Sequence, residues 1–178
     1  EPQTQPFNIW VTGSTKSLLF PTSTPAFRKN NAGKTDAFIT KLDWPNFVMI
    51  SSTYLGGTEN DEGTSIDVDL NGYPYITGFT ESEVNPIKLF PILLGAFQST
   101  YGGGKYDAFI TKMNPDLQSI NYSTYLGGNY EDRGYDIAVD NMSNAYVTGF
   151  TISDNFPTMN ALYPTREGLV SDVFLTIM

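Results

Sequence analysis

The stretch YDAFITKMNPDLQSINYSTYLGG, from Tyr106 to Gly128, closely repeats the earlier stretch TDAFITKLDWPNFVMISSTYLGG, from Thr35 to Gly57. Both copies place β-branched and aromatic residues around a short polar segment that contains proline. Self-similarity at a fixed spacing is typical of proteins built from repeated supersecondary units. We therefore interpret the chain as a series of repeats.

The spacing of the repeat is 71 residues. Four pairs of identical residues keep it: Asp36 and Asp107, Gly57 and Gly128, Gly63 and Gly134, and Thr77 and Thr148. A shorter motif occurs three times, as IWVTGST (9–15), YITGFT (75–80) and YVTGFT (146–151), and the final SDVFLTIM matches TDAFITKL and YDAFITKM. We expect one segment spanning 1–178 with about two and a half units and repeat landmarks at 8–57, 58–128 and 129–178.

Each unit contains four segments with the alternation and the β-branched or aromatic enrichment of strands. In the clearest copies these are YDIAVD (135–140), AYVTGFT (145–151), DAFITKM (107–113) and INYSTYLGG (120–128). The turn NPDL (114–117) has proline at its second position. In LNGY (70–73), the central dipeptide Asn-Gly is typical of a hairpin turn between the first and second strands. With no convincing helical period, the pattern predicts an all-β chain of four-stranded antiparallel meanders.

The long connection between the second and third strands contains the dipeptide Phe-Pro in every copy, at Phe20, Phe90 and Phe156. A loop in which an apolar residue recurs is expected to pack rather than to remain in solvent. We predict that this loop caps its own sheet or fills the gap to the next one.

Four-stranded units in series can bury their faces by radial stacking, as the blades of a β-propeller do, or by stacking into a β-solenoid. Solenoid coils are commonly shorter and lack antiparallel hairpins. The pattern therefore favours β-propeller blades that are incomplete at both ends.

The ordered motifs DAFITKM, YSTYLGG, GYDIAVD, NAYVTGFT and FP resemble the SBBP beta-propeller repeat of bacterial and archaeal surface and secreted proteins. The resemblance covers nearly all of the chain after residue 7. It implies a propeller without a known catalytic activity, in which IAVD forms the inner strand of a blade and STYLGG the outer one. On this alignment the chain begins at a second strand, at Ile9, and ends at a third, at Met178.

An isolated partial propeller would expose apolar blade faces and unpaired strand edges, which promote aggregation. Two explanations follow from this: the chain is a piece of a larger protein, or neighbouring chains complete it. The expected partners are accordingly other protein chains or further repeats of the same polypeptide, with glycans as a further class.

The composition limits the chemistry that the chain can perform. Nineteen acidic against ten basic side chains give a net charge of −9, which disfavours nucleic acid as a partner, and Cys and His are absent. The absence of these two residues excludes disulfides, thiolate and imidazole metal ligands, and triads that use His as a base. We predict no membrane span, no catalytic residues, no cofactor and a secreted or cell-surface location.

One segment resembles the start of a calcium loop. In DVDLNG, Asp67, Asp69 and Asn71 stand at every second position, as the oxygen ligands at the start of a calcium loop do. This spacing makes them candidate metal ligands. The next unit has Ala138 and Met142 in place of Asp67 and Asn71, while Asp69 recurs as Asp140. The competing interpretation is a hairpin turn capped by the recurring aspartate.

Acidic clusters follow each LGG motif: Glu59, Asp61 and Glu62 in one unit, Glu131 and Asp132 in the next. Paired carboxylates can hydrolyse glycosidic bonds. A catalytic site, however, rarely needs one copy in every blade. The repeat therefore favours a structural role in which Asp61 and Asp132 accept backbone N–H groups before the inner strand.

Two features point towards glycans. NYS and NMS are sequons that make Asn121 and Asn141 candidate glycosylation sites, although a chain rich in Asn, Ser and Thr produces such triplets by chance. Aromatic side chains that stack on sugars are a second feature, and four are not assigned to the core: Trp10, Trp44, Tyr73 and Tyr130.

The sequence leaves two functions open. The favoured one is a non-enzymatic extracellular or cell-surface propeller serving adhesion, recognition or structural assembly. The alternative is a carbohydrate-binding or carbohydrate-active propeller, with a site formed by loops of neighbouring blades.

Overall fold

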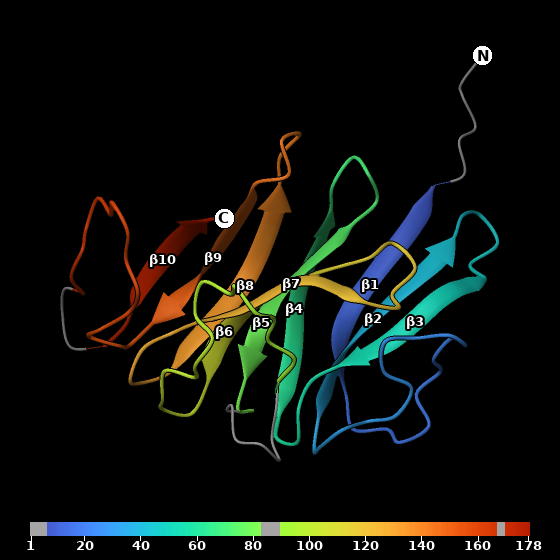
Figure 1. The fold of residues 1–178 in the computed structure, drawn as a ribbon, viewed down its shortest axis with the longest axis horizontal. Helices are drawn as coiled ribbons and strands as arrows, with labels where there is room; N and C mark the ends of the chain where they lie inside the picture. The colour runs from blue at the N-terminus through green and yellow to red at the C-terminus, as the bar shows by residue number, and fades with distance from the viewer. Residues whose placement is uncertain (1–6, 83–89, 167–169) are drawn as a thin grey trace.

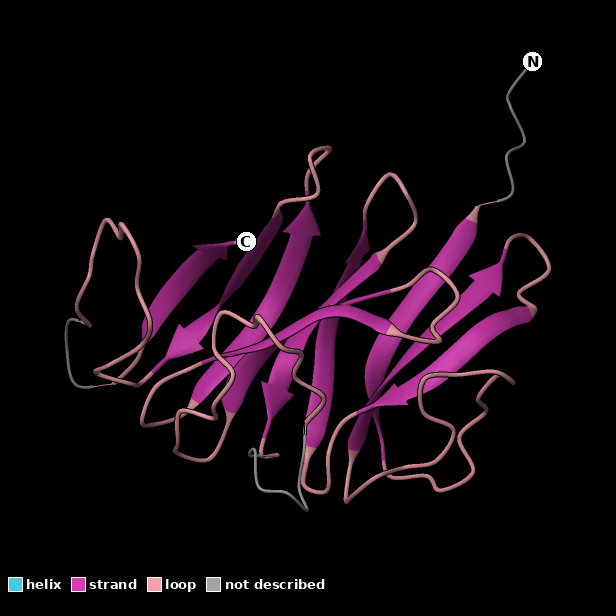
Figure 2. Ribbon diagram, viewed as in Figure 1, coloured by secondary structure: helices cyan, strands magenta, loops and turns pink. Residues whose placement is uncertain are grey.

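The computed structural model of the chain describes residues 7–82, 90–166 and 170–178. Within this part of the chain there is no helix, and the strands form three antiparallel sheets (Figure 2). The first sheet has the order β1-β2-β3, formed by β1 (Asn8–Thr15), β2 (Asp36–Asp43) and β3 (Met49–Leu55). The all-β prediction is confirmed.

The second sheet is a complete meander of the kind predicted for one unit. Its order is β4-β5-β6-β7, formed by β4 (Asp61–Val68), β5 (Pro74–Thr80), β6 (Asp107–Met113) and β7 (Ile120–Leu126). The third sheet has the order β10-β9-β8, formed by β8 (Asp132–Val139), β9 (Ala145–Thr151) and β10 (Asp172–Ile177). Among the described residues, the first sheet has no counterpart of β4 and the third has none of β7.

The three sheets lie side by side, from the blue and cyan first sheet to the orange and red third one (Figure 1). Strand β4 packs against both β1 and β8, so the second sheet lies between the other two. One core, which includes Ile39, Ile76 and Phe109, lies between the first two sheets. A second core, which includes Ile110 and Val147, lies between the second and third sheets. Stacked antiparallel meanders of this kind are consistent with propeller blades.

A bulge shapes the first strand of each unit. The pairing of β4 with β5 shifts register between Gly63 and Ser65, and that of β8 with β9 shifts between Gly134 and Asp136. A bulge re-aims the extra residue of a strand, which here is Thr64 in β4. The alternation in the sequence did not indicate this shift.

The turn between β4 and β5 differs in register from the prediction. The N–H of Gly72 bonds to the carbonyl of Asp69 at 2.9 Å, so Leu70 and Asn71 are its central residues. The Asp69 carboxylate accepts the N–H groups of Asn71 (2.9 Å) and Tyr73 (3.0 Å), which fixes this register. Glycine takes the following position because its φ is +83°. The predicted capping role of Asp69 is thereby confirmed.

The loops with the Phe-Pro dipeptide pack as predicted. Each of their phenylalanines lies on a phenylalanine of the strand that follows the loop: Phe20 on Phe38 in β2, Phe90 on Phe109 in β6, and Phe156 on Phe174 in β10, with ring centroids 4.5, 4.6 and 4.7 Å apart. The loop after β1 also reaches the second sheet, where the N–H of Phe27 bonds to the carbonyl of Leu117 at 2.8 Å. The loops therefore cap their own sheets and join neighbouring ones.

Within the described residues, no helix is long and apolar enough to cross a membrane.

Candidate functional site

Strands β4 and β8 take part in contacts between neighbouring sheets. The hydroxyl of Thr64, the bulged residue of β4, donates to the carbonyl of Gly134 in β8 at 2.9 Å. Asp67 of β4 accepts the N–H of Val139 in β8 at 2.7 Å. A side chain of one sheet thus bonds to the backbone of the next in both cases.

The candidate calcium ligands have separate partners. Asp67 bonds to Val139 and accepts the N–H of Val68 at 2.8 Å, whereas Asp69 accepts turn N–H groups and Asn71 is exposed. Among the described residues, no three or more acidic, His or Cys side chains form a group that could hold a metal ion. The geometry therefore gives the calcium hypothesis no support.

Asp69 instead belongs to a cluster that the sequence did not reveal. Its Oδ2 lies 3.2 Å from Lys112 Nζ, and that ammonium also donates to the hydroxyl of Tyr75 at 2.5 Å. Lys112 lies over the rings of Tyr73 and Tyr75, 4.8 and 4.6 Å from their centroids. Ser143 of the third sheet donates to Asp69 at 3.2 Å. The cluster therefore joins β6, the turn after β4 and the next sheet.

The charges in this cluster are stabilised by their hydrogen bonds. Burial tends to raise the pKa of Asp69, but the donors Tyr73, Lys112 and Asn71 outweigh it and lower the pKa below its usual value. Burial likewise tends to lower the pKa of Lys112, yet hydrogen bonds with Tyr75 and Asp69 raise it. Both groups are therefore charged at neutral pH.

Asp61 and Asp132 accept backbone N–H groups before the first strand, as predicted. Asp61 bonds to the N–H of Gly57 and Asp132 to that of Gly128, each at 2.6 Å. Both are fully buried, and hydroxyls complete their contacts: Thr80 and Ser82 donate to Asp61, and Ser153 to Asp132. These two aspartates hold the turns that enter β4 and β8.

The other members of the acidic clusters have different surroundings from these aspartates. Glu59 pairs with Lys34 at 2.5 Å, and Glu131 pairs with Arg133 at 2.5 Å, while Glu62 is partly buried in β4. Glu59 and Glu131 therefore face basic partners, and the two aspartates face the interior.

The glycan-related candidates are mostly accessible. Asn121, in the outer strand β7, and Asn141, in the turn after β8, are both exposed. Trp44 and Tyr130 are about half exposed, whereas Trp10 and Tyr73 pack against the first and second cores. The structure does not bring these six residues together on one element.

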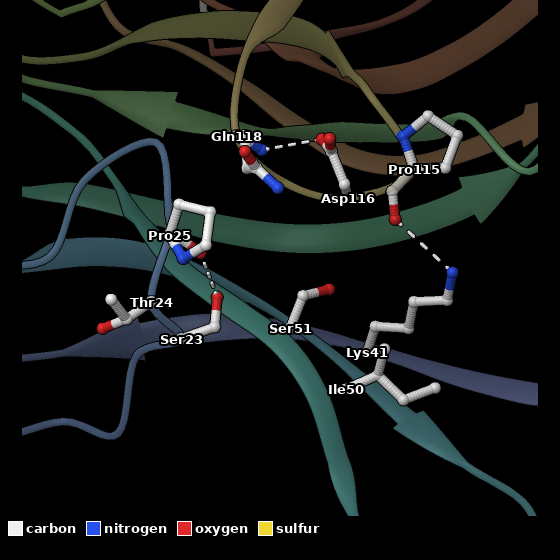
Figure 3. A pocket seen from close by; sticks show the side chains of 9 residues that line it. All are labelled: Ser23, Thr24, Pro25, Lys41, Ile50, Ser51, Pro115, Asp116 and Gln118. Carbon is white, nitrogen blue, oxygen red and sulfur yellow. Dashed lines mark hydrogen bonds between the residues drawn. The ribbon is translucent and has the colours of Figure 1, made fainter.

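A hollow lies between the first and second sheets (Figure 3). Its volume is about 360 Å³, and nine residues line it: Ser23, Thr24, Pro25, Lys41, Ile50, Ser51, Pro115, Asp116 and Gln118. The Lys41 ammonium reaches the carbonyl of Pro115 at 3.4 Å, and the buried hydroxyl of Ser51 has no hydrogen-bond partner. Polar groups with incomplete hydrogen bonding therefore line a gap between sheets.

The repeat places a different side chain at the position equivalent to Ser51 in the second sheet. Lys41 pairs with Ser51 across β2 and β3, and at the equivalent place Lys112 pairs with Tyr122. The hydroxyl of Tyr122 reaches the sulfur of Met178 in the third sheet at 3.9 Å. Ser51 is smaller than the tyrosine at the equivalent place and so leaves more space beside Lys41, and alignment at the 71-residue spacing could have revealed this difference.

The outward face of the third sheet is apolar and open. Val173, Leu175 and Ile177 of β10 are 83, 64 and 59% exposed. Their counterparts in the second sheet include Ala108 and Ile110, which are 0 and 1% exposed because the third sheet covers them. The residues of this open face thus occupy positions that contact a neighbouring sheet at the previous junction, but no sheet among the described residues covers them here.

Comparison with known proteins agrees with the repeat seen in this geometry. The family model described as SBBP: Beta-propeller repeat matches residues 52–83 and again residues 121–157. Each match begins in the last strand of one sheet and ends after the second strand of the next, and thus spans a junction. No curated protein matches the chain. The chain therefore contains SBBP beta-propeller repeats.

Proposed function

We propose that the chain is part of a non-enzymatic extracellular or cell-surface propeller that serves adhesion, recognition or structural assembly. In this proposal the open face of β10 binds a further sheet of the same repeat type. The observation that carries it is the exposure of Val173 and Leu175 at positions whose counterparts are buried between the second and third sheets.

The junction between the second and third sheets supports this choice of occupant. There, Ala108 and Ile110 of one sheet pack against Ile137 and Val147 of the next, and the same kind of contact can be made on β10. Burial of apolar surface contributes about 25 cal/mol per Å², so a covered face of this kind favours association. The chain has no cysteine, so it carries no thiol that an oxidising exterior would modify.

The test uses the chain of residues 1–178 and a variant with a charge on the open face. We expect the native chain to self-associate as its concentration rises, and Leu175→Lys to stay monomeric, by light scattering coupled to size-exclusion chromatography. Leu162→Lys, on an exposed loop, is the matched control and should behave as the native chain does. Equal masses for the native chain and Leu175→Lys at every concentration would overturn the proposal.

The hollow at the first junction supports a second candidate, glycan binding between neighbouring sheets. Lys41 and the exposed Gln118 amide supply donors for a ligand rich in oxygen acceptors. Ser51→Tyr introduces the residue of the next repeat and fills the space. We expect it to abolish glycan-array binding shown by the native chain, and array binding unchanged by this substitution would exclude the hollow.

A further inference from the structure

Two pairs of buried aspartates recur at the two junctions between sheets. One pair is Asp36 and Asp61, and the other is Asp107 and Asp132, 71 residues further along. The first aspartate of each pair begins β2 or β6, and the second begins β4 or β8, the first strand of the next sheet. All four side chains are fully buried. The junctions are thus built around paired acids with no access to water.

Both carboxyl groups of the first pair lie next to Gly56. A Cβ on Gly56 would lie 2.8 Å from Asp36 Oδ1 and 2.8 Å from Asp61 Oδ2. At the second junction a Cβ on Gly127 would lie 2.5 Å from Asp107 Oδ1. No side chain therefore separates the carboxyl groups of the first pair, and glycine keeps the same space clear at the second.

The hydrogen bonds are unequally divided within each pair. Asp61 and Asp132 each accept a backbone N–H and at least one hydroxyl. Asp36 and Asp107 each accept one N–H, from Ala32 at 2.7 Å and from Gly102 at 2.6 Å. Oδ1 of Asp36 and Oδ1 of Asp107 have no hydrogen-bond partner. An ionised carboxylate with an unpaired buried oxygen is costly, whereas a protonated one is neutral.

Nearby charges do not neutralise the pairs directly. The titratable and charged groups around the first pair are Arg28, Lys34, Glu59 and Glu81, and those around the second are Lys105, Tyr106, Glu131 and Arg133. The hydrogen bonds to the four aspartates come from backbone N–H groups and hydroxyls rather than from these cations. Lys34 and Arg133 are instead engaged by glutamates.

Burial raises the pKa of all four aspartates. It raises the pKa of Asp61 to about 7 and that of Asp107 to about 8, and the neighbouring acid of each pair adds to both shifts. Two carboxylates that share a buried site cannot both ionise easily, so their protons are lost in separate steps. A raised pKa is expected for these carboxyl groups, because an ionised carboxylate with an unpaired buried oxygen is costly.

We propose that each aspartate pair holds one proton at neutral pH, which makes the contact between neighbouring sheets proton-dependent. In the unfolded chain these acids titrate near pH 3.9. Because the folded state binds the extra protons, the free energy of unfolding falls as the pH rises from about 4 through about 8. The junctions are therefore most stable in acidic surroundings near pH 4 and weaken progressively as the pH rises to about 8.

The direct test follows the aspartate carboxyl carbons by ¹³C NMR across a pH titration of the native chain. We expect two buried carboxyls, one in each pair, to titrate with apparent pKa values near 7 to 8. Titration of all four below pH 5 would overturn the proposal. A thermal midpoint at pH 8 that depends on added calcium and is lowered by EDTA, with all four carboxyls ionised, would overturn it in favour of a cation.

The variant test compares Asp107→Asn with Asp116→Asn, which changes an exposed turn aspartate. The amide at 107 can still accept the N–H of Gly102 and is neutral at every pH. We expect the thermal midpoint of Asp107→Asn to fall less than that of the native chain between pH 6 and 9. The thermal midpoint of Asp116→Asn should fall with pH as steeply as that of the native chain. Asp36→Asn provides the same comparison at the other junction if Asp107→Asn does not fold, and native slopes in both variants would contradict the shared proton.

Discussion

The carboxylate of Asp67 in β4 accepts a hydrogen bond from the N–H of Val139 in β8, with 2.7 Å between the two atoms. This bond joins two sheets at their first strands, outside any strand ladder. Without it, the N–H of Val139 would lose the acceptor that the neighbouring sheet supplies. The junction between the second and third sheets therefore depends on a single acidic side chain at this point.

We predict that Asp67→Ala destabilises the chain by about 1–2 kcal/mol, because it leaves a partly buried N–H without its acceptor. Urea denaturation followed by tryptophan fluorescence measures the change. Ser65→Ala removes the bond from the Ser65 hydroxyl to Asp136, which is exposed, and should cost less than about 0.5 kcal/mol. Equal losses for the two variants would contradict the importance of Asp67.

The phenylalanines of the third strands provide a matched pair. Phe109 is fully buried beneath Phe90, whereas Phe38 packs on Phe20 and is only partly buried. We expect Phe109→Ala to cost about 3–5 kcal/mol, since it leaves a cavity in the core, and Phe38→Ala to cost clearly less. Thermal unfolding followed by circular dichroism distinguishes the two, and an equal loss of stability would contradict the different environments.

The glycine of the TG motif allows a close approach between strands. A Cβ on Gly78 would lie 1.8 Å from the carbonyl oxygen of Glu62 in β4. At the equivalent Gly13 the nearest atom is a ring carbon of Phe38, at 2.9 Å. We expect Gly78→Ala to cost about 3 kcal/mol because backbone must move, and Gly13→Ala to cost less because a side chain can shift. Chemical denaturation of both variants gives the comparison, and a larger loss at Gly13 would refute it.

Lys112 and Lys41 occupy equivalent positions with different partners. Lys112 pairs with the buried Asp69, whereas Lys41 lies over Trp10 and reaches only a carbonyl at 3.4 Å. We predict that Lys112→Met costs about 2 kcal/mol at pH 7, because it leaves a buried carboxylate without its cation, and that Lys41→Met costs less.

This cost should depend on pH with a definite sign. The pKa of Asp69 is lowered in the folded state, so the stability it contributes is present above the unfolded value near 3.9 and is lost as the pH falls through the folded value. We therefore expect the difference between Lys112→Met and the native chain to shrink below pH 4. Urea unfolding at pH 7 and pH 3 measures it, and a difference that grows at low pH would contradict the pairing.

The repeat made the strands predictable. Asp36 and Asp107 mark the starts of β2 and β6 because a buried aspartate begins the third strand in both copies. The Phe-Pro dipeptides likewise indicated a packed loop, since an exposed Phe90 would have no reason to recur. Alternation and spacing are local properties of the chain, and the ladder within each sheet follows from them.

The contacts between sheets could not be derived in the same way. The bulge at Thr64 directs its hydroxyl towards Gly134, and alternation does not indicate where such a shift occurs. The approach of Asp36 to Asp61 depends on how one sheet lies against the next, which the spacing leaves undetermined. The sequence indicated that Asp61 caps a turn, but not that a second buried acid lies beside it.

The bonds across each junction have a consequence for how such proteins change over evolutionary time. The N–H of Asp61 bonds to the carbonyl of Thr35, and that of Asp132 bonds to the carbonyl of Tyr106, both at 2.7 Å. Threonine and tyrosine serve equally here because only the main chain takes part. A joint that recognises the main chain of its neighbour tolerates divergence of the adjoining unit, so units can be duplicated, exchanged or added without redesign of the contact.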